Sequence, residues 1–231
     1  MIASIIRQPW CIIATDSSQA RSFDFTDSTK NVYKTDVDKL HISNGIVFTE
    51  GGNPQVFAAF HRRLAMESEA KGGIEGALKK APTLMNRSAR AWEAETKYKH
   101  PKANQTFIRE ARSTYSIIIG WSERRKRILA GTVCDDPSHN SLAPENGYLI
   151  QYPVDATKKT VEAYIKGLLF GPTRMPMTHE GAVEAVKKCV RDTAEIEAAR
   201  LGVKRMAGAI RVVLIDGANP PRVISNDELL G

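Results

Sequence analysis

The side chains best suited to bind a metal ion gather around residue 135. Asp135, Asp136 and His139 offer carboxylate oxygens and an imidazole nitrogen, which are common ligands of divalent cations. A proline, a serine and an asparagine lie among them, and this composition is typical of a polar surface loop. The five histidines show no HxxxH spacing, so a catalytic zinc site is not indicated. We therefore predict no metal site and no cofactor.

Cysteine chemistry offers a second set of candidates. Cys11, Cys134 and Cys189 lie far apart in the chain, and no two of them form a CxxC pair. This usage suits a reducing compartment, in which thiols are buried as small hydrophobic side chains. We expect a cytoplasmic protein, or a virion component if the chain is encoded by a phage.

Basic residues could bind an anionic partner. The formal net charge is +7, and the densest basic cluster is Arg124, Arg125, Lys126 and Arg127. No aromatic residues interleave with the basic clusters as a stacking platform would require, which disfavours nucleic acid as a partner. A solvated turn is the simpler interpretation of residues 124–127, and docking of an acidic protein is the alternative.

The stretch TEGGNPQ at 49–55 could present backbone amides to an anion, because it leads from a predicted strand into a predicted helix. It lacks the lysine and the serine or threonine that make a phosphate loop convincing. Gly51 and Gly52 are better explained as the residues of a tight turn.

The length and composition predict one globular domain over residues 1–231. The chain is 42% hydrophobic, which suffices for a substantial core. Its apolar runs are far shorter than the roughly 20 residues that a membrane span needs. The apolar start has no basic leader before it, so we expect neither a secretory signal nor a membrane segment.

Hydrophobic patterning predicts the elements that must position these groups. Alternating and short apolar runs, with an Asn-Gly turn at 44–45, predict strands at 2–7, 10–16, 37–42, 46–49, 115–121, 128–133, 147–152, 210–215 and 222–224. Helical spacing predicts helices from about 54, over 82–112 with a break near 100, and from 178 to 202. A hinge is expected at 71–76. Strands at both ends around central helices favour an α+β domain with stacked sheets.

Five stretches in this order resemble the proteasome β-subunit type of N-terminal-nucleophile hydrolase. The stretches are CIIATDS at 11–17, TDVDKLHISNGIVFTEGG at 35–52, YSIIIGWSERRKRILAGTV at 115–133, MTHEGAVEAVKKCVRDTAEIEAARLG at 177–202 and AIRVVLIDGANPPRVIS at 209–225. The resemblance implies a four-layer αββα sandwich. It also implies that the family's helix before the last long one is shortened or missing, because only GPTRMPM is available for it.

The resemblance implies a specific active site. In that family a threonine, serine or cysteine at the amino terminus attacks a carbonyl, with its own α-amino group as base. A lysine lowers the pKa of the nucleophile, and an aspartate positions the lysine. Here Asp16 matches the aspartate, and either Asp38 or, after a shift of one residue, Lys39 matches the lysine.

Other parts of that site do not carry over. Met1 and Ile2 have no hydroxyl or thiol, and we expect Met1 to be kept because it precedes a bulky residue. The family's serine is missing from 167–170, and Lys204 and Ala207 fall near its later Asp and Ser. We therefore predict a catalytically degenerate member in which Asp16 and Lys39 are vestiges.

Two readings would restore a nucleophile. Removal of ten residues would make Cys11 the first residue, with Asp27 at about the family's spacing; a buried structural cysteine is the simpler interpretation. Ser4 would also need cleavage, and it lies too close to Asp16 for the family's spacing.

Members of the family usually assemble into rings, and a member without catalysis most plausibly keeps that assembly role. The leading hypothesis is thus a non-catalytic, ring-forming structural protein, a homo-oligomer or one subunit of a larger assembly. A phage tail, neck or baseplate is one setting that it includes. The alternative is an active, self-processing peptidase of the proteasome type.

Overall fold

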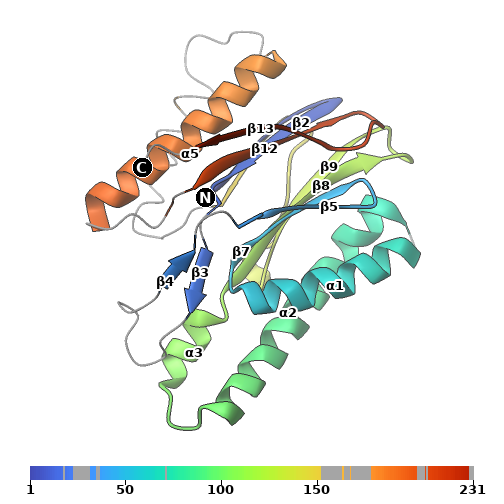
Figure 1. Cartoon of the computed structure of the whole chain (residues 1–231). Coiled ribbons are helices and arrows are strands. Elements are labelled where there is room, and N and C mark those ends of the chain that lie inside the picture. The colour runs from blue at the N-terminus through green and yellow to red at the C-terminus, as the bar shows by residue number, and fades with distance from the viewer. Residues whose placement is uncertain are drawn as a thin grey trace.

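The computed structural model describes residues 1–17, 19–22, 32–34, 37–70, 72–151, 163, 167, 178–201, 206 and 208–228. These residues form a mixed α/β fold with two large antiparallel sheets, a two-stranded sheet and four α-helices (Figure 1). The two-stranded sheet pairs β3 (Gln19–Ser22) with β4 (Val32–Lys34).

The first large sheet brings the start and the end of the chain together. Its strand order is β11-β1-β2-β12-β13, where the strands are β1 (Ile2–Arg7), β2 (Trp10–Thr15), β11 (Gly147–Gln151), β12 (Ala209–Asp216) and β13 (Arg222–Glu228). The apolar runs of β1 and β2 are buried because both faces of this sheet are covered, one by α5 and the other by side chains of the second sheet.

The second large sheet has the order β10-β9-β8-β6-β5. Its strands are β5 (Leu40–Ser43), β6 (Ile46–Thr49), β8 (Thr114–Ser122), β9 (Arg127–Cys134) and β10 (Ser141–Leu142), and β7 (Gly51–Gly52) pairs with β8. A short 3₁₀ turn, Pro137–His139, lies between β9 and β10. The Asn44–Gly45 turn joins β5 to β6 with both residues at positive φ, as predicted.

Helices cover the outer faces of the sheets. α5 (His179–Leu201) packs on β1, β2 and β12 of the first sheet, and α1 (Pro54–Ala70) and α2 (Gly73–Lys99) pack on the second. α3 (Gln105–Ala111) follows α2 and contacts it. None of the helices described combines the length and apolar composition that crossing a lipid bilayer requires.

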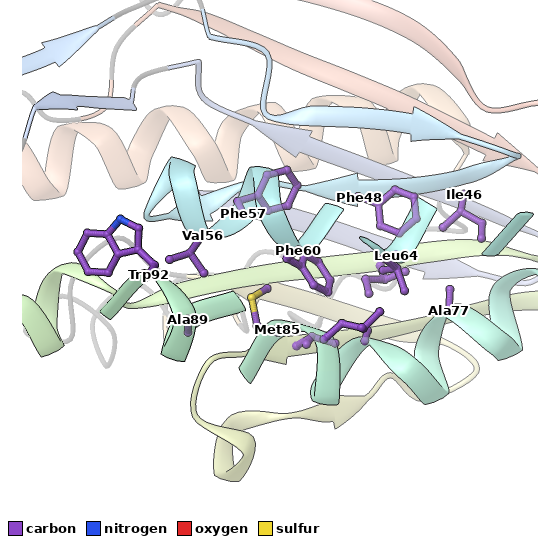
Figure 2. Packing of buried hydrophobic residues seen from close by; sticks show 14 of the residues in the cluster. Ile46, Phe48, Val56, Phe57, Phe60, Leu64, Ala77, Met85, Ala89 and Trp92 are labelled. Carbon is purple, nitrogen blue, oxygen red and sulfur yellow. The ribbon is translucent and has the colours of Figure 1, made fainter. Parts of the chain in front are cut away.

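Three hydrophobic clusters hold these layers together. One lies between α5 and the first sheet, and a second joins β6 and β8 to α1 and α2. Figure 2 shows the second cluster, in which Phe60 of α1 lies near Met85 of α2, with Phe57 of α1 and Phe48 of β6 on the side toward the sheet. The third contains side chains from both sheets, such as Ile13 and Ile117, so the sheets face one another.

The helix boundaries differ from those predicted. α2 begins at Gly73 rather than at 82, and it runs through Pro82 to Lys99. Its start is set by Gly72, which has a left-handed backbone with φ of 98°, so the predicted hinge is reduced to a tight turn. The chain around 100 then leads into the separate helix α3, where an Asn104 side chain caps the first turn.

The glycine pair before α1 forms the short strand β7. Gly51 and Gly52 pair with Tyr115 and Thr114 of β8, and Gly52 has a φ of 82°. A Cβ on Gly52 would lie 2.1 Å from the backbone oxygen of Ser113, so no other residue fits there. The prediction of a tight turn at this position was wrong, because Gly51 and Gly52 form the short strand β7, which continues along β8 in the same register as β6.

Asn53, which follows β7, links the start of α1 to the end of α3, and its replacement should destabilise the fold. Its buried side-chain oxygen accepts hydrogen bonds from the amides of Gln55 and Val56, and its side-chain nitrogen donates to the Ala111 carbonyl at 2.7 Å. We expect Asn53→Ala to lower the free energy of unfolding by about 2–3 kcal/mol. Denaturant unfolding measures this. The Asn104→Ala variant, at the exposed cap of α3, should lose about 1 kcal/mol; equal losses would contradict the bridging role.

Candidate functional site

Asp16 lies at the centre of a buried group of charges. Its Oδ1 accepts a hydrogen bond from the α-amino group of Met1 at 2.5 Å, and its Oδ2 accepts one from Lys39 Nζ at 3.0 Å. The side chains of Met1 and Asp16 are 0% exposed, and that of Lys39 is 12% exposed. One carboxylate thus bridges two amino groups at the edge of the core.

The pairing of β1 with β2 places Met1 against Asp16. Ile2 lies opposite Thr15 in this antiparallel pair, so the residue before the one strand faces the residue after the other. The amide of Val37 donates to the Ser17 carbonyl at 2.9 Å, which brings the segment before β5 to the same place. Local strand geometry therefore assembles the group.

The structure distinguishes the two registers that the sequence left open for the lysine. Lys39 faces Asp16, whereas Asp38 turns away and forms an ion pair with Arg211 at 2.9 Å. Asp38 also accepts a hydrogen bond from the Leu40 amide, as is common for an aspartate just before a strand.

Two further titratable groups influence this site electrostatically. Glu197 of α5 is fully buried, and its charge acts on the Met1 amine. Burial lowers the pKa of the Met1 amine below its ordinary value, although the Asp16 carboxylate opposes that shift. Burial also raises the pKa of the Tyr115 hydroxyl, and the negative charges of Asp16 and Glu197 add to this. Tyr115 is therefore neutral at physiological pH.

The arrangement has the acid and the amines of a nucleophile site without the nucleophile. Met1 carries a thioether, which packs in the hydrophobic cluster under α5. A thioether has no proton to give up and forms no acyl intermediate of the kind that a hydroxyl or thiol forms. The amine has no exposed surface among the described residues, and its bond to Asp16 holds two charges together.

The alternative nucleophiles occupy structural positions. Cys11 lies within β2 between Ile6 and Ile215 of the neighbouring strands, and it is 0% exposed. Burial raises the pKa of the Cys11 thiol far above its ordinary value, so the thiol stays protonated. The buried Ser4 hydroxyl donates to the Leu149 carbonyl and accepts from its amide.

Some residues of the sequence-based argument lie outside the described residues. They are Asp27, Lys204, Ala207, the GPTRMPM stretch at 171–177 and most of 167–170.

The residues considered for metal binding have separate partners. Asp135 accepts hydrogen bonds from Arg112 Nε at 3.2 Å and the Thr114 amide at 3.0 Å. Asp136 accepts from the amide and hydroxyl of Ser138, which closes the turn before β10. In the part of the chain that the structure describes, no three metal-ligating side chains come together.

The basic cluster 124–127 forms the turn between β8 and β9. Arg124, Arg125 and Lys126 are exposed, and Lys126 pairs with Glu123 at 2.9 Å. Arg127 is half-buried and forms an ion pair with Glu145. A cavity of about 300 Å³ opens beside this turn, and Arg125 and Arg127 contribute to its wall.

Comparison with solved structures relates the whole fold to Anbu proteins. The Gly-1 mutant of Anbu from Hyphomicrobium sp. strain MC1 aligns with a TM-score of 0.61 at 12% identity, covering 99% of this chain and 86% of that one. Anbu from Yersinia bercovieri, described as an ancestral β-subunit, aligns with a TM-score of 0.58 at 12% identity over 98% and 87% of the two chains. No family model and no curated protein matched the sequence. The likeness shows a proteasome-like fold.

Sequence reasoning missed the role of the Met1 amine. It treated residue 1 only as a position that lacks a nucleophilic side chain, although every chain start carries a charged amino group. The available signal was an apolar run that starts at residue 1 and pairs with a strand ending in an aspartate. A charge at the head of a buried strand needs a counter-charge.

Proposed function

We propose that this chain is a non-catalytic, ring-forming structural protein, a degenerate relative of proteasome-type hydrolases with one domain over residues 1–231. In this proposal the former active-site charges, Asp16 and Lys39, hold the chain start in the core. The finer architecture proposed is a four-layer αββα sandwich in the order α5, first sheet, second sheet, then α1 with α2. A virion component and a cytoplasmic complex are both compatible settings.

One observation carries the proposal. The α-amino group of Met1 is fully buried and bonded to Asp16, and the resemblance implies that the family's nucleophilic first residue would stand at this end of the first strand. A base cannot act from a position that substrate and water do not reach, and no hydroxyl or thiol lies on residue 1.

The expectation of assembly has its own support. β13 forms an end of the first sheet among the described strands, and it exposes Val223 and Ile224 by 56% and 38%. An edge strand with apolar side chains invites pairing with another chain. A neighbouring subunit that covers β13 would bury this surface.

Intact mass and native mass, measured on the purified protein beside a fluorogenic peptide assay, test the proposal. We expect Met1 retained as the first residue, one discrete oligomer and no hydrolysis above that of a heat-denatured sample. A chain whose new first residue is Thr, Ser or Cys, together with turnover, would contradict the proposal. A strictly monomeric native mass would contradict the assembly role alone.

A second candidate function, an active self-processing peptidase, is favoured by the Asp16–Lys39 ion pair. A lysine held by a buried aspartate is the arrangement that lowers a nucleophile's pKa in the resembling family. Labelling with an electrophilic probe of threonine and cysteine nucleophiles, followed by peptide mapping, separates the candidates. Modification at Cys11 after loss of residues 1–10 would favour this second function.

A further inference from the structure

A cleft lies beside the basic turn, away from the Met1 site. It has a volume of about 300 Å³ and is bounded by α2, by the start of β9 and by the segment from β10 to Glu145. This volume is at the lower end of the range for binding pockets, enough for one or two aliphatic side chains.

The walls of the cleft are mostly apolar. Leu78 of α2, Leu129 of β9 and Pro144 line it, together with Leu142 of β10, whose side chain is 75% exposed. The ends of Leu78 and Leu142 both lie against Gly131, at 3.1 and 3.3 Å from where a Cβ would be. The two leucine side chains close over Gly131, and Leu142 leaves apolar surface exposed to water, which is unfavourable.

The charges around the cleft leave an excess of positive charge. Both carboxylates in the wall are engaged, since Glu75 accepts a hydrogen bond from the Ser122 hydroxyl and Glu145 pairs with Arg127. Within the described ranges, Lys79 and Arg125 have no side-chain partner. The Nε–H of Arg127 is buried and also has no hydrogen-bond acceptor there. A ligand carboxylate would pair with the exposed Lys79 and Arg125.

The cleft runs beside a sheet end. β10 pairs with β9 and is the last strand of its sheet among the strands described, and both of its residues are exposed. An extended peptide can align along such an edge, with alternate side chains entering an adjacent pocket. A compact small molecule would bind in the pocket without contacting the edge of β10.

We propose that this cleft is a docking site for an extended segment of a partner protein, one that carries a carboxylate next to one or two leucine-sized side chains. The apolar wall takes the aliphatic side chains, and Arg125 with Lys79 takes the carboxylate. The inference does not rest on the proposed function, because a monomer would present the same cleft.

Fluorescence anisotropy with a labelled peptide tests this directly. The probe is fluorescein-Gly-Ser-Glu-Asp-Leu-Leu-Ser, which has two acids followed by two leucines and does not repeat a stretch of this chain, titrated with the full-length protein at low salt. We expect saturable binding, and about tenfold weaker binding of the same peptide with lysines in place of both acids. Affinity should fall as salt rises, since the charges are exposed.

Matched variants place the binding at the cleft. Arg125→Glu should weaken binding of the acidic probe about tenfold. Arg124→Glu changes the neighbouring exposed residue, which lies outside the cleft, and its affinity for the probe should stay within about twofold of the unmodified protein's. Leu142→Asp should abolish binding, and thermal unfolding of each variant checks that it is folded. Equal binding of both peptides, or equal effects at residues 124 and 125, would overturn the proposal. Dissociation of an oligomer by Leu142→Asp without loss of probe binding would overturn it in favour of a second copy.

Discussion

Asp16→Asn is expected to lower the free energy of unfolding by about 3–5 kcal/mol, because it removes the only formal negative charge that touches both buried amino groups in the described site. The amide that replaces the carboxylate can still accept a hydrogen bond on one side. It then directs its own N–H groups toward the Met1 amine or toward Lys39, and a donor facing a donor is unfavourable.

Chemical denaturation of the unmodified protein and of Asp16→Asn measures the effect, and the dependence of unfolding free energy on denaturant concentration should be the same for both. The matched control is Asp38→Asn, which removes a carboxylate one residue from Lys39. Asp38 is 55% exposed and pairs with Arg211 at the surface, so its loss should cost no more than about 1 kcal/mol. If the Asp16 variant is no less stable than the Asp38 variant, the buried charges do not hold the chain start.

The contrast between Asp16 and Asp38 shows which parts of the site could be predicted from the sequence. Strand alternation and turn residues predicted both partners of the β8–β9 hairpin, because that pattern needs only local information. The register at Lys39 was not predictable in this way. β5 begins at Leu40, so residues 38 and 39 precede the strand, and alternation does not fix which side chain points inward.

The predicted start of α2 was wrong for a related reason. The sequence pattern predicted this helix from about 82, after a glycine-rich hinge at 71–76. The structure begins the helix at Gly73, and buried Ile74, Ala77 and Ala81 pack its first turns on the second sheet. Burial of this face outweighs the backbone bond lost at Pro82, and no local rule reports such tertiary packing.

The strongest test of the Met1 site acts on the amine itself. Acetylation of Met1 in the chain that starts at this residue removes the positive charge and adds an acetyl group where no surface is exposed. We expect a loss of at least about 3 kcal/mol in the free energy of unfolding, because the acetyl group must displace core atoms and the resulting amide keeps only one N–H to donate to Asp16. Comparison of acetylated and free protein, each verified by intact mass, measures it.

The pH dependence gives an independent readout of the same amine. Burial places the pKa of the folded-state amine below its ordinary value of 8.0, so the unfolded chain binds more protons than the folded chain between the two values. Stability contributed by this group must therefore rise with pH across that window and level off above about 8. The acetylated chain has no amine to titrate, and its stability should lack this rise.

Combining the two changes separates charge pairing from steric fit. In Asp16→Asn the amine no longer has a carboxylate to bond, so acetylation should cost less there than in the unmodified chain, and the difference is the coupling energy of the pair. Loss of Asp16 also removes the charge that raises the amine's pKa, so the rise of stability with pH should extend to lower pH. Equal acetylation costs in both backgrounds would show that the acetyl group harms the fold by its size alone. The charge pair would then be a vestige without a structural role.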